Sequence, residues 1–227
     1  MLKKTTGIVV SYLRYKETSI IVKIFTRELG LRSYIVNGVR SNKSKMALYQ
    51  PLTLVDLVVY DKANTTLNRI SEARLTHAFQ KIPFEYMRTG IAMFVGELLS
   101  KCIYDNYENP ELFDFISGSV WLLDQEDVAL THFPLAFLLG ISRFLGFAPE
   151  DPDEFFEELG FEKHLGDTLV DEKKYLGALL QASYNCSEKV SGLYRRNLLD
   201  YFLLYFSKHL DAAGDWKSVK VLRQVLS

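Results

Sequence analysis

Two short apolar runs, joined by a corner that contains a glycine, occupy residues 19–36. The residues of the first run alternate with a period of two, so that Ile20, Val22 and Ile24 fall on one face of an extended chain. This alternation, with β-branched residues on both faces, is typical of a β-strand. The corner at residues 26–30 predicts a turn, and the second run predicts the returning strand.

A basic segment follows this pair of predicted strands. Asn37 and Gly38 end the second strand, because both residue types tolerate positive φ. The residues that come next carry Arg40, Lys43 and Lys45. The segment therefore predicts a flexible basic loop outside the core.

Further β-type runs lie in the first third of the chain, at residues 6–15, 52–60 and, more weakly, 66–79. Five short strands within about 80 residues predict a small closed barrel, and an OB-fold is a five-stranded barrel of this size. Periodicity alone does not fix the topology, and an SH3-like barrel fits nearly as well.

The apolar pattern changes at Pro83 from a period of two to the helical period of about 3.6. Favourable N-caps stand at Asn109, just before a proline, and at Asp151, where Glu154 completes a capping box. The predicted helix at residues 133–147 carries Arg143 as its only charge and is the predicted centre of a helical bundle. The predicted helical segments are residues 91–103, 112–123, 133–147, 169–182, 190–210 and 216–226, with a further acidic helix starting near residue 151.

This change of pattern predicts two domains. The chain has 227 residues, enough for one large domain or two small ones. The expected fold class is α+β: a five-stranded OB-fold-like barrel in residues 1–80, followed by an all-helical domain in residues 81–227.

The charge is distributed very unevenly along the chain. Residues 1–81 contain 14 Lys and Arg against 5 Asp and Glu, a net charge of +9. Residues 82–227 contain 13 against 23, a net charge of −10, so that the whole chain carries only −1. The basic first third has the electrostatic footprint of a nucleic-acid-binding domain.

Single-stranded nucleic acid binds where cations follow the phosphates and aromatic rings stack on the bases. Tyr12, Tyr15, Tyr34 and Tyr49 are the candidate stacking rings, and Lys16 and Arg74 add to the basic set. The alternative is that the cations only solvate a small barrel whose tyrosines form its core. The predicted DNA contacts are Arg14, Lys23, Arg27, Arg32, Arg40, Lys43, Lys45 and Arg69.

Residues suited to catalysis or metal binding are scattered. Two cysteines are too few for a disulfide framework or a cysteine-rich zinc site. The acidic run of residues 151–158 could hold a divalent ion in a metal-dependent enzyme, but carboxylates that complement a helix dipole are the favoured interpretation. No metal-ligand spacing connects the four histidines, His77, His132, His164 and His209. The sequence therefore predicts no catalytic residue, no metal site and no cofactor.

No stretch of the sequence approaches 18 uncharged apolar residues, which argues against a membrane-spanning helix. Residues 1–7 include two lysines but no apolar run of the kind that forms a signal peptide. A cytoplasmic protein that binds no membrane is expected.

Several motifs together carry a resemblance to a known family. In the first third they are Gly7–Val10, Glu17–Val22, Phe25–Gly30, Gly38–Arg40 with Lys43 and Ser44, and Gln50–Thr53. In the helical part they are Phe144–Pro149 and Lys217–Leu222. In this order along most of the chain, these motifs resemble the bacterial recombination mediator family RecO.

The resemblance implies an N-terminal OB-fold, a helical domain and a non-enzymatic role in DNA repair. It implies binding of single- and double-stranded DNA, annealing of complementary strands, and assistance to RecA in loading onto DNA covered by single-strand-binding protein. The implied partners are RecR and the acidic tail of single-strand-binding protein. By motif, the likeness places DNA contacts on Arg27, Arg32, Arg40, Lys43 and Lys45.

The sequence departs from the family pattern in one segment. Many relatives carry a four-cysteine zinc module after the Leu-Gly-Phe-x-Pro motif, whereas residues 150–180 contain no cysteine here. Zinc is therefore not expected. A protein-interaction scaffold, with the helical domain as its working surface, is the alternative function, although a scaffold has no need for such segregated charge.

Overall fold

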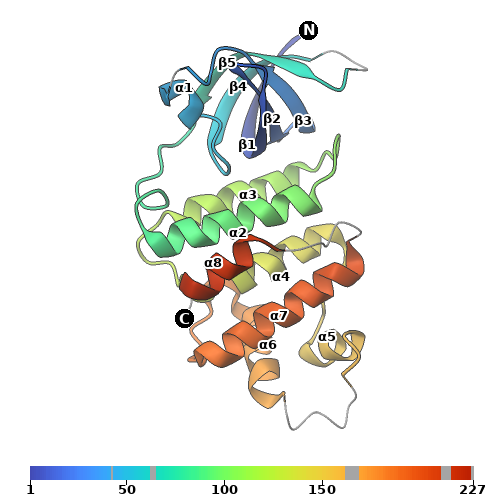
Figure 1. Cartoon of the computed structure of the whole chain (residues 1–227). Helices are drawn as coiled ribbons and strands as arrows, with labels where there is room; N and C mark the ends of the chain where they lie inside the picture. Colours follow the sequence, from blue (N-terminus) through green and yellow to red (C-terminus); the bar gives the residue numbers. More distant parts are fainter. Residues whose placement is uncertain (42, 62–64, 162–168, 211–215, 226–227) are drawn as a thin grey trace. The chain divides into compact units, whose positions relative to one another are not determined.

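The computed structural model describes residues 1–41, 43–61, 65–161, 169–210 and 216–225 (Figure 1). It divides into two units, one made of Met1–Gln80 with Gly96–Trp121 and the other of Lys81–Val95 with Leu122–Ser227. The division passes through two helices, Tyr86–Cys102 and Pro110–Leu123, that the sequence assigns wholly to the helical domain. The predicted domain boundary after residue 80 stays a prediction.

Five strands of the first unit form a closed barrel in the order β1-β2-β3-β5-β4, with β4 paired back to β1 (Figure 1). All neighbouring pairs are antiparallel except β3 and β5, which run parallel. This topology confirms the predicted OB-fold-like barrel. The strands are β1 (Leu2–Tyr15), β2 (Ser19–Thr26), β3 (Gly30–Val36), β4 (Leu54–Tyr60) and β5 (Asn68–Leu75).

Strand β1 closes the barrel because it pairs with two neighbours. Its first half pairs with β4 and its second half with β2, and Gly7 lies where the two ladders meet. A Cβ at Gly7 would lie 2.5 Å from the Ile24 side chain, so only glycine allows this close approach. An irregular register between Val9 and Ser11 follows, as is common where a strand bends around a barrel.

The prediction of a flexible basic loop after β3 was wrong in two respects. A short helix, α1 (Lys43–Ala47), forms there, and Val39 is completely buried. Met46 and Leu48 pack on the same core, together with the buried ring of Tyr49. The basic segment is therefore anchored to the barrel by its apolar residues.

The segment that joins the next two helices, α2 (Tyr86–Cys102) and α3 (Pro110–Leu123), is tied to the barrel. Leu31 N donates to the Tyr107 carbonyl at 3.2 Å, and Asn106 N donates to the Leu31 carbonyl at 2.9 Å. Gly30 has a φ of +67°, and a Cβ there would overlap the Tyr107 carbonyl. The Phe25 and Phe113 rings, 6.0 Å apart, add an apolar contact.

The second unit is helical, as the sequence predicts. Its helices are α4 (Phe133–Leu145), α5 (Pro152–Glu158), α6 (Val170–Ala182), α7 (Gly192–His209) and α8 (Ser218–Val225), with a 3-10 turn at Ser183–Asn185. Every residue of α4 up to Ser142 is buried, and α4 packs against α6 and α7. The predicted central helix is thereby confirmed.

The predicted caps are present. Asn109 Oδ1 accepts a hydrogen bond from Leu112 N at 2.9 Å, and Asp151 Oδ1 accepts one from Glu154 N at 2.9 Å. The reciprocal bond of the capping box comes from Glu150 N to Glu154 Oε2, one residue earlier than in the standard motif. Two carboxylates of the acidic run, those of Asp151 and Glu154, therefore act at the start of α5.

Candidate nucleic-acid interface

Two of the predicted DNA contacts on β2 and the turn after it are held by carboxylates of the same unit. Arg27 donates from Nε and Nη2 to the two carboxylate oxygens of Asp114, at 2.8 and 2.9 Å. Lys23 Nζ lies 2.9 Å from Asp105 Oδ1. The hydrogen bonds from Arg27 lower the pKa of Asp114, and those to Asp114 raise the pKa of Arg27. These cations neutralise protein charge in the free molecule.

Arg32 is the third cation held in this way. Its Nη2 lies 3.4 Å from Glu108 Oε1, its Nη1 donates to Asn106 Oδ1, and its Nε donates to the Leu29 carbonyl at 2.9 Å. Two of these contacts connect the start of β3 to the segment between α2 and α3, and the third connects it to the turn before β3. The Arg32 side chain is only about a quarter exposed, so it offers less free surface than its sequence position indicates.

The Arg40 side chain is exposed, but it binds backbone carbonyls of a neighbouring turn. Its Nη1 donates to the carbonyls of Lys16 and Glu17, at 2.9 and 2.8 Å, and its backbone N–H donates to the Thr18 carbonyl at 3.0 Å. Arg40 therefore clamps the turn between β1 and β2. The side chain of Lys43 lies outside the described residues.

Two of the three remaining predicted contacts, Lys45 and Arg69, line one groove of about 290 Å³ between α1, β3 and β5. Its apolar lining comes from Ile35, Val36, Val39, Leu48, Tyr49 and Ile70. Among the described residues, the side chains of Arg69 and Arg14 make no hydrogen bond or ion pair. Arg14 is the register partner of Ile20, which in turn pairs with Val36 at the groove. Two strand spacings, about 10 Å, therefore separate Arg14 from the groove lining.

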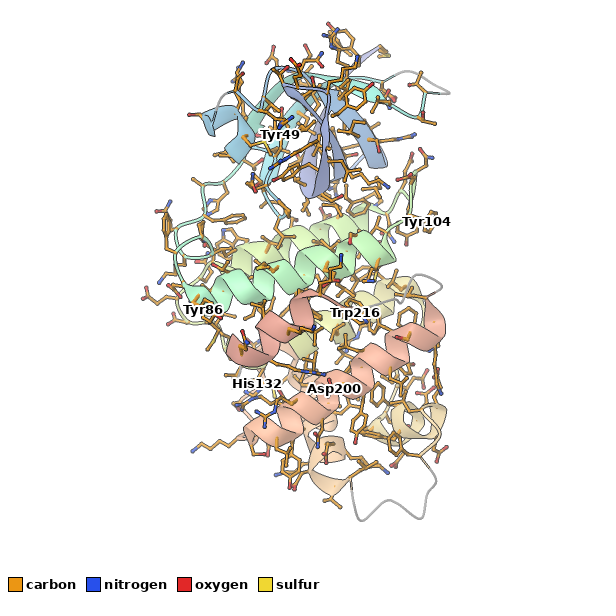
Figure 2. The ribbon with its side chains drawn as sticks, viewed as in Figure 1. Tyr49, Tyr86, Tyr104, His132, Asp200 and Trp216 are labelled. Carbon is orange, nitrogen blue, oxygen red and sulfur yellow. The ribbon has the colours of Figure 1, made fainter. Side chains whose placement is uncertain are left out.

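The candidate stacking tyrosines are mostly unavailable. Tyr34 and Tyr49 belong to the barrel core, where burial raises the pKa of both phenols, and Tyr49 lies between α1 and the barrel (Figure 2). The prediction that these two rings stack on bases was wrong, because they face inward. Tyr12 is half-buried against the same core, and the Tyr15 ring lies under Lys16 Nζ at 5.4 Å.

Two tyrosines that the sequence did not single out are exposed in this unit. Tyr60, at the end of β4, is 43% exposed, and Tyr104, after α2, is 68% exposed and projects outward (Figure 2). Val55, Leu57 and Val59 of β4 are buried. Their alternation places Tyr60 on the outer face, so the sequence carried this signal.

The acidic residues around α2 and α3 reduce the charge of the first unit. Residues 96–121 contain 1 Lys or Arg and 5 Asp or Glu, while residues 1–80 contain 13 and 5. The unit as a whole therefore carries 14 basic and 10 acidic residues, a net charge of +4. The net charge of the barrel residues is thus partly cancelled by carboxylates within the same unit.

Features of other functional classes are sparse in the described part of the chain. No group of three or more His, Cys, Asp and Glu side chains suited to a metal ion occurs there, and none of its helices could cross a membrane. Asp153 of the acidic run pairs with Lys173 at 2.6 Å. Cys102 and Cys186 are both buried, unbridged thiols, as the sequence predicts.

Comparison with known proteins decides the family. Residues 1–79 match the model of the recombination protein O N-terminal region, and residues 83–198 match that of its C-terminal region. The chain belongs to the RecO family. A DNA repair protein RecO of Phocaeicola vulgatus is 33% identical over 241 residues, covering 100% of both chains. Those of Flavobacterium psychrophilum and Bacteroides fragilis are 31% and 32% identical and cover 99% of both chains.

Membership of the RecO family assigns this chain to DNA repair and confirms the resemblance that the motifs carry. The match extends through both the barrel and the helical region, so the family assignment applies to the whole architecture. It does not depend on the cysteine module that is missing here.

Proposed function

We propose that this RecO-family chain is a non-enzymatic, cytoplasmic recombination mediator. It binds single- and double-stranded DNA, anneals complementary strands, and assists RecA in loading onto DNA covered by single-strand-binding protein. RecR and the acidic tail of single-strand-binding protein are its proposed protein partners. Family membership supports the repair role, and the barrel surface supports the DNA-binding step.

The observation that carries the DNA-binding proposal is the groove shared by Lys45 and Arg69 on an OB-fold-like barrel. Arg14 lies in register with the same end of the barrel, about 10 Å from the groove lining. Cations around an open groove capture phosphates of any sequence, which is what annealing of arbitrary complementary strands requires. Lys23, Arg27 and Arg32 contribute less in the free protein, because carboxylates already neutralise them.

The test is fluorescence anisotropy of a labelled oligonucleotide, titrated at several salt concentrations. The unaltered protein is compared with the double variant Lys45→Glu, Arg69→Glu. A matched control, Lys189→Glu with Lys220→Glu, makes the same change of charge on exposed residues of the helical unit. The groove variant is expected to lose affinity and to flatten the salt dependence by about 0.7 for each single-strand phosphate contact removed.

A second set of charge reversals tests the predicted loop contacts. The triple variant Arg40→Glu, Lys43→Glu, Lys45→Glu is expected to bind still more weakly, but Arg40 also clamps the turn between β1 and β2. Its thermal unfolding must therefore be measured beside its affinity. Equal binding by the groove variant and the helical-unit control would contradict the proposed interface.

The alternative function, a protein-interaction scaffold, is supported by exposed apolar side chains in the helical unit. Phe84, Tyr86 and Met93 all expose large apolar surface (Figure 2 labels Tyr86). Exposed apolar residues that lie near one another are typical of protein interaction sites. Absence of DNA binding at low salt, with the fold intact, would favour this function over the first.

A further inference from the structure

Tyr60 and Arg69 lie side by side on the outer face of the barrel. They are direct register partners on the antiparallel strands β4 and β5. Side chains of such partners point to the same face and lie within contact range of each other. Tyr60 is 43% exposed, and the side chain of Arg69 makes no hydrogen bond or ion pair with any described residue.

A hollow of about 480 Å³ adjoins this pair. It is lined by Tyr60, Arg69, Ile70 and Ser71, and it lies on the same strand that borders the proposed DNA groove. Arg69 lines both spaces, so a strand whose phosphates follow the groove can reach the ring.

Asp61, which follows Tyr60 in the chain, does not strongly repel an anionic ligand. Lys3 Nζ lies 2.6 Å from Asp61 Oδ2. The hydrogen bond from Lys3 is the main reason that the pKa of Asp61 is lowered. The carboxylate is thus neutralised by a partner on the neighbouring strand, and the cation of Arg69 stays available for a phosphate.

We propose that Tyr60 stacks on an unpaired nucleobase while Arg69 holds the adjacent phosphate, so that this pair makes the barrel prefer single strands. The proposal rests on the proposed DNA-binding function and adds a base-recognition site to it. An exposed aromatic ring stacks on any base, because every base has a π face. The bases of a duplex are stacked on one another, so a duplex offers the ring no such face.

The experiment measures affinities of Tyr60→Ala, Tyr60→Leu and Tyr60→Phe for three ligands by anisotropy. The ligands are a single-stranded oligonucleotide, a duplex, and an abasic strand with the same number of phosphates. Tyr60→Ala and Tyr60→Leu are expected to lower the affinity for the single strand about 10-fold. Their affinities for the duplex and the abasic strand stay unchanged, and Tyr60→Phe binds like the unaltered protein.

Tyr104→Ala is the control, because it removes a tyrosine that is even more exposed than Tyr60 and whose neighbour, Asp105, is acidic. It is expected to leave all three affinities unchanged. Equal losses on all three ligands, or no loss with Tyr60→Ala, would overturn the stacking site while the proposed function stands. If the unaltered protein binds none of the ligands, the proposed function fails and the stacking site fails with it.

Discussion

Arg27 holds both carboxylate oxygens of Asp114, although 87 positions separate the two residues. The pair connects the turn between β2 and β3 to α3 within the first unit. A bidentate Arg–carboxylate pair has a fixed geometry, so it positions these two elements as well as neutralising their charges. Arg27, a predicted DNA contact, therefore makes an internal ion pair in the free protein.

Asp114→Asn tests this pair through the pH dependence of stability. The pKa of Asp114 is lowered in the folded protein, so its contribution to stability is present above the unfolded-state pKa of about 3.9 and is lost as the pH falls through the lower folded-state pKa. Urea unfolding should show the unaltered protein more stable than the variant at pH 7. The difference should shrink towards pH 3, and a constant difference would contradict the assignment.

Neutralising the three carboxylates should strengthen DNA binding. In the variant Asp105→Asn, Glu108→Gln, Asp114→Asn, the cations that these groups now hold become available to phosphates. The affinity for a single strand should rise at low salt, and its salt dependence should steepen by up to about 2, since each phosphate contact contributes about 0.7. Anisotropy at several salt concentrations measures both quantities. Unchanged binding would show that DNA does not reach this side of the barrel.

Gly30→Ala should destabilise the barrel much more than Gly38→Ala does. Both glycines have positive φ, but a Cβ at Gly30 would overlap the Tyr107 carbonyl, while a Cβ at Gly38 would meet nothing within 4 Å. Gly38→Ala should therefore cost only the backbone strain, about 1–2 kcal/mol. Gly30→Ala should cost about 3 kcal/mol or more, since overpacking adds to the strain. Urea unfolding of the two variants gives the comparison, and equal losses would contradict the close approach.

His132 should make the helical unit sensitive to mild acid. Its Nδ1 lies 2.7 Å from the Tyr175 hydroxyl, and burial, with a smaller effect of Arg195, lowers its pKa. A lowered pKa means that the unfolded chain binds the proton more tightly, so stability is full above the unfolded-state pKa of about 6.5 and falls below it. His132→Gln should lose about 1 kcal/mol at pH 7.5 with its hydrogen bond.

The measurement is urea unfolding at pH 7.5 and pH 5.5. The unaltered protein should lose more stability between these two pH values than His132→Gln does, because glutamine does not titrate. An equal loss in both proteins would place the acid sensitivity elsewhere.

Local patterns predicted most of the elements correctly. The period of two in residues 19–36 and the change at Pro83 correspond to strands β2 and β3 and to the start of the helical region. Asn109 and Asp151 cap the helices that their positions indicate. Helix α1 was missed because five residues give too little periodicity to distinguish a helix from a loop.

The candidate interface was predicted less well, because it depends on pairings between distant residues. Charge counted along the sequence marked Lys23, Arg27 and Arg32 as free cations, whereas Asp105 and Asp114 hold the first two of them. Inward rotation of Tyr34 and Tyr49 likewise follows from closure of the barrel rather than from residue type.

The sequence by itself determined the barrel-plus-helix architecture and the family, because alternation, caps and ordered motifs act over short stretches of chain. Only the tertiary structure decided which cations face solvent, since an ion pair between residues 27 and 114 needs both to be brought together by folding. The same holds for Tyr60 and Arg69, whose proximity comes from the register of β4 against β5. Burial and pairing, rather than residue type, separate the surface that can meet DNA from the surface that holds the barrel in place.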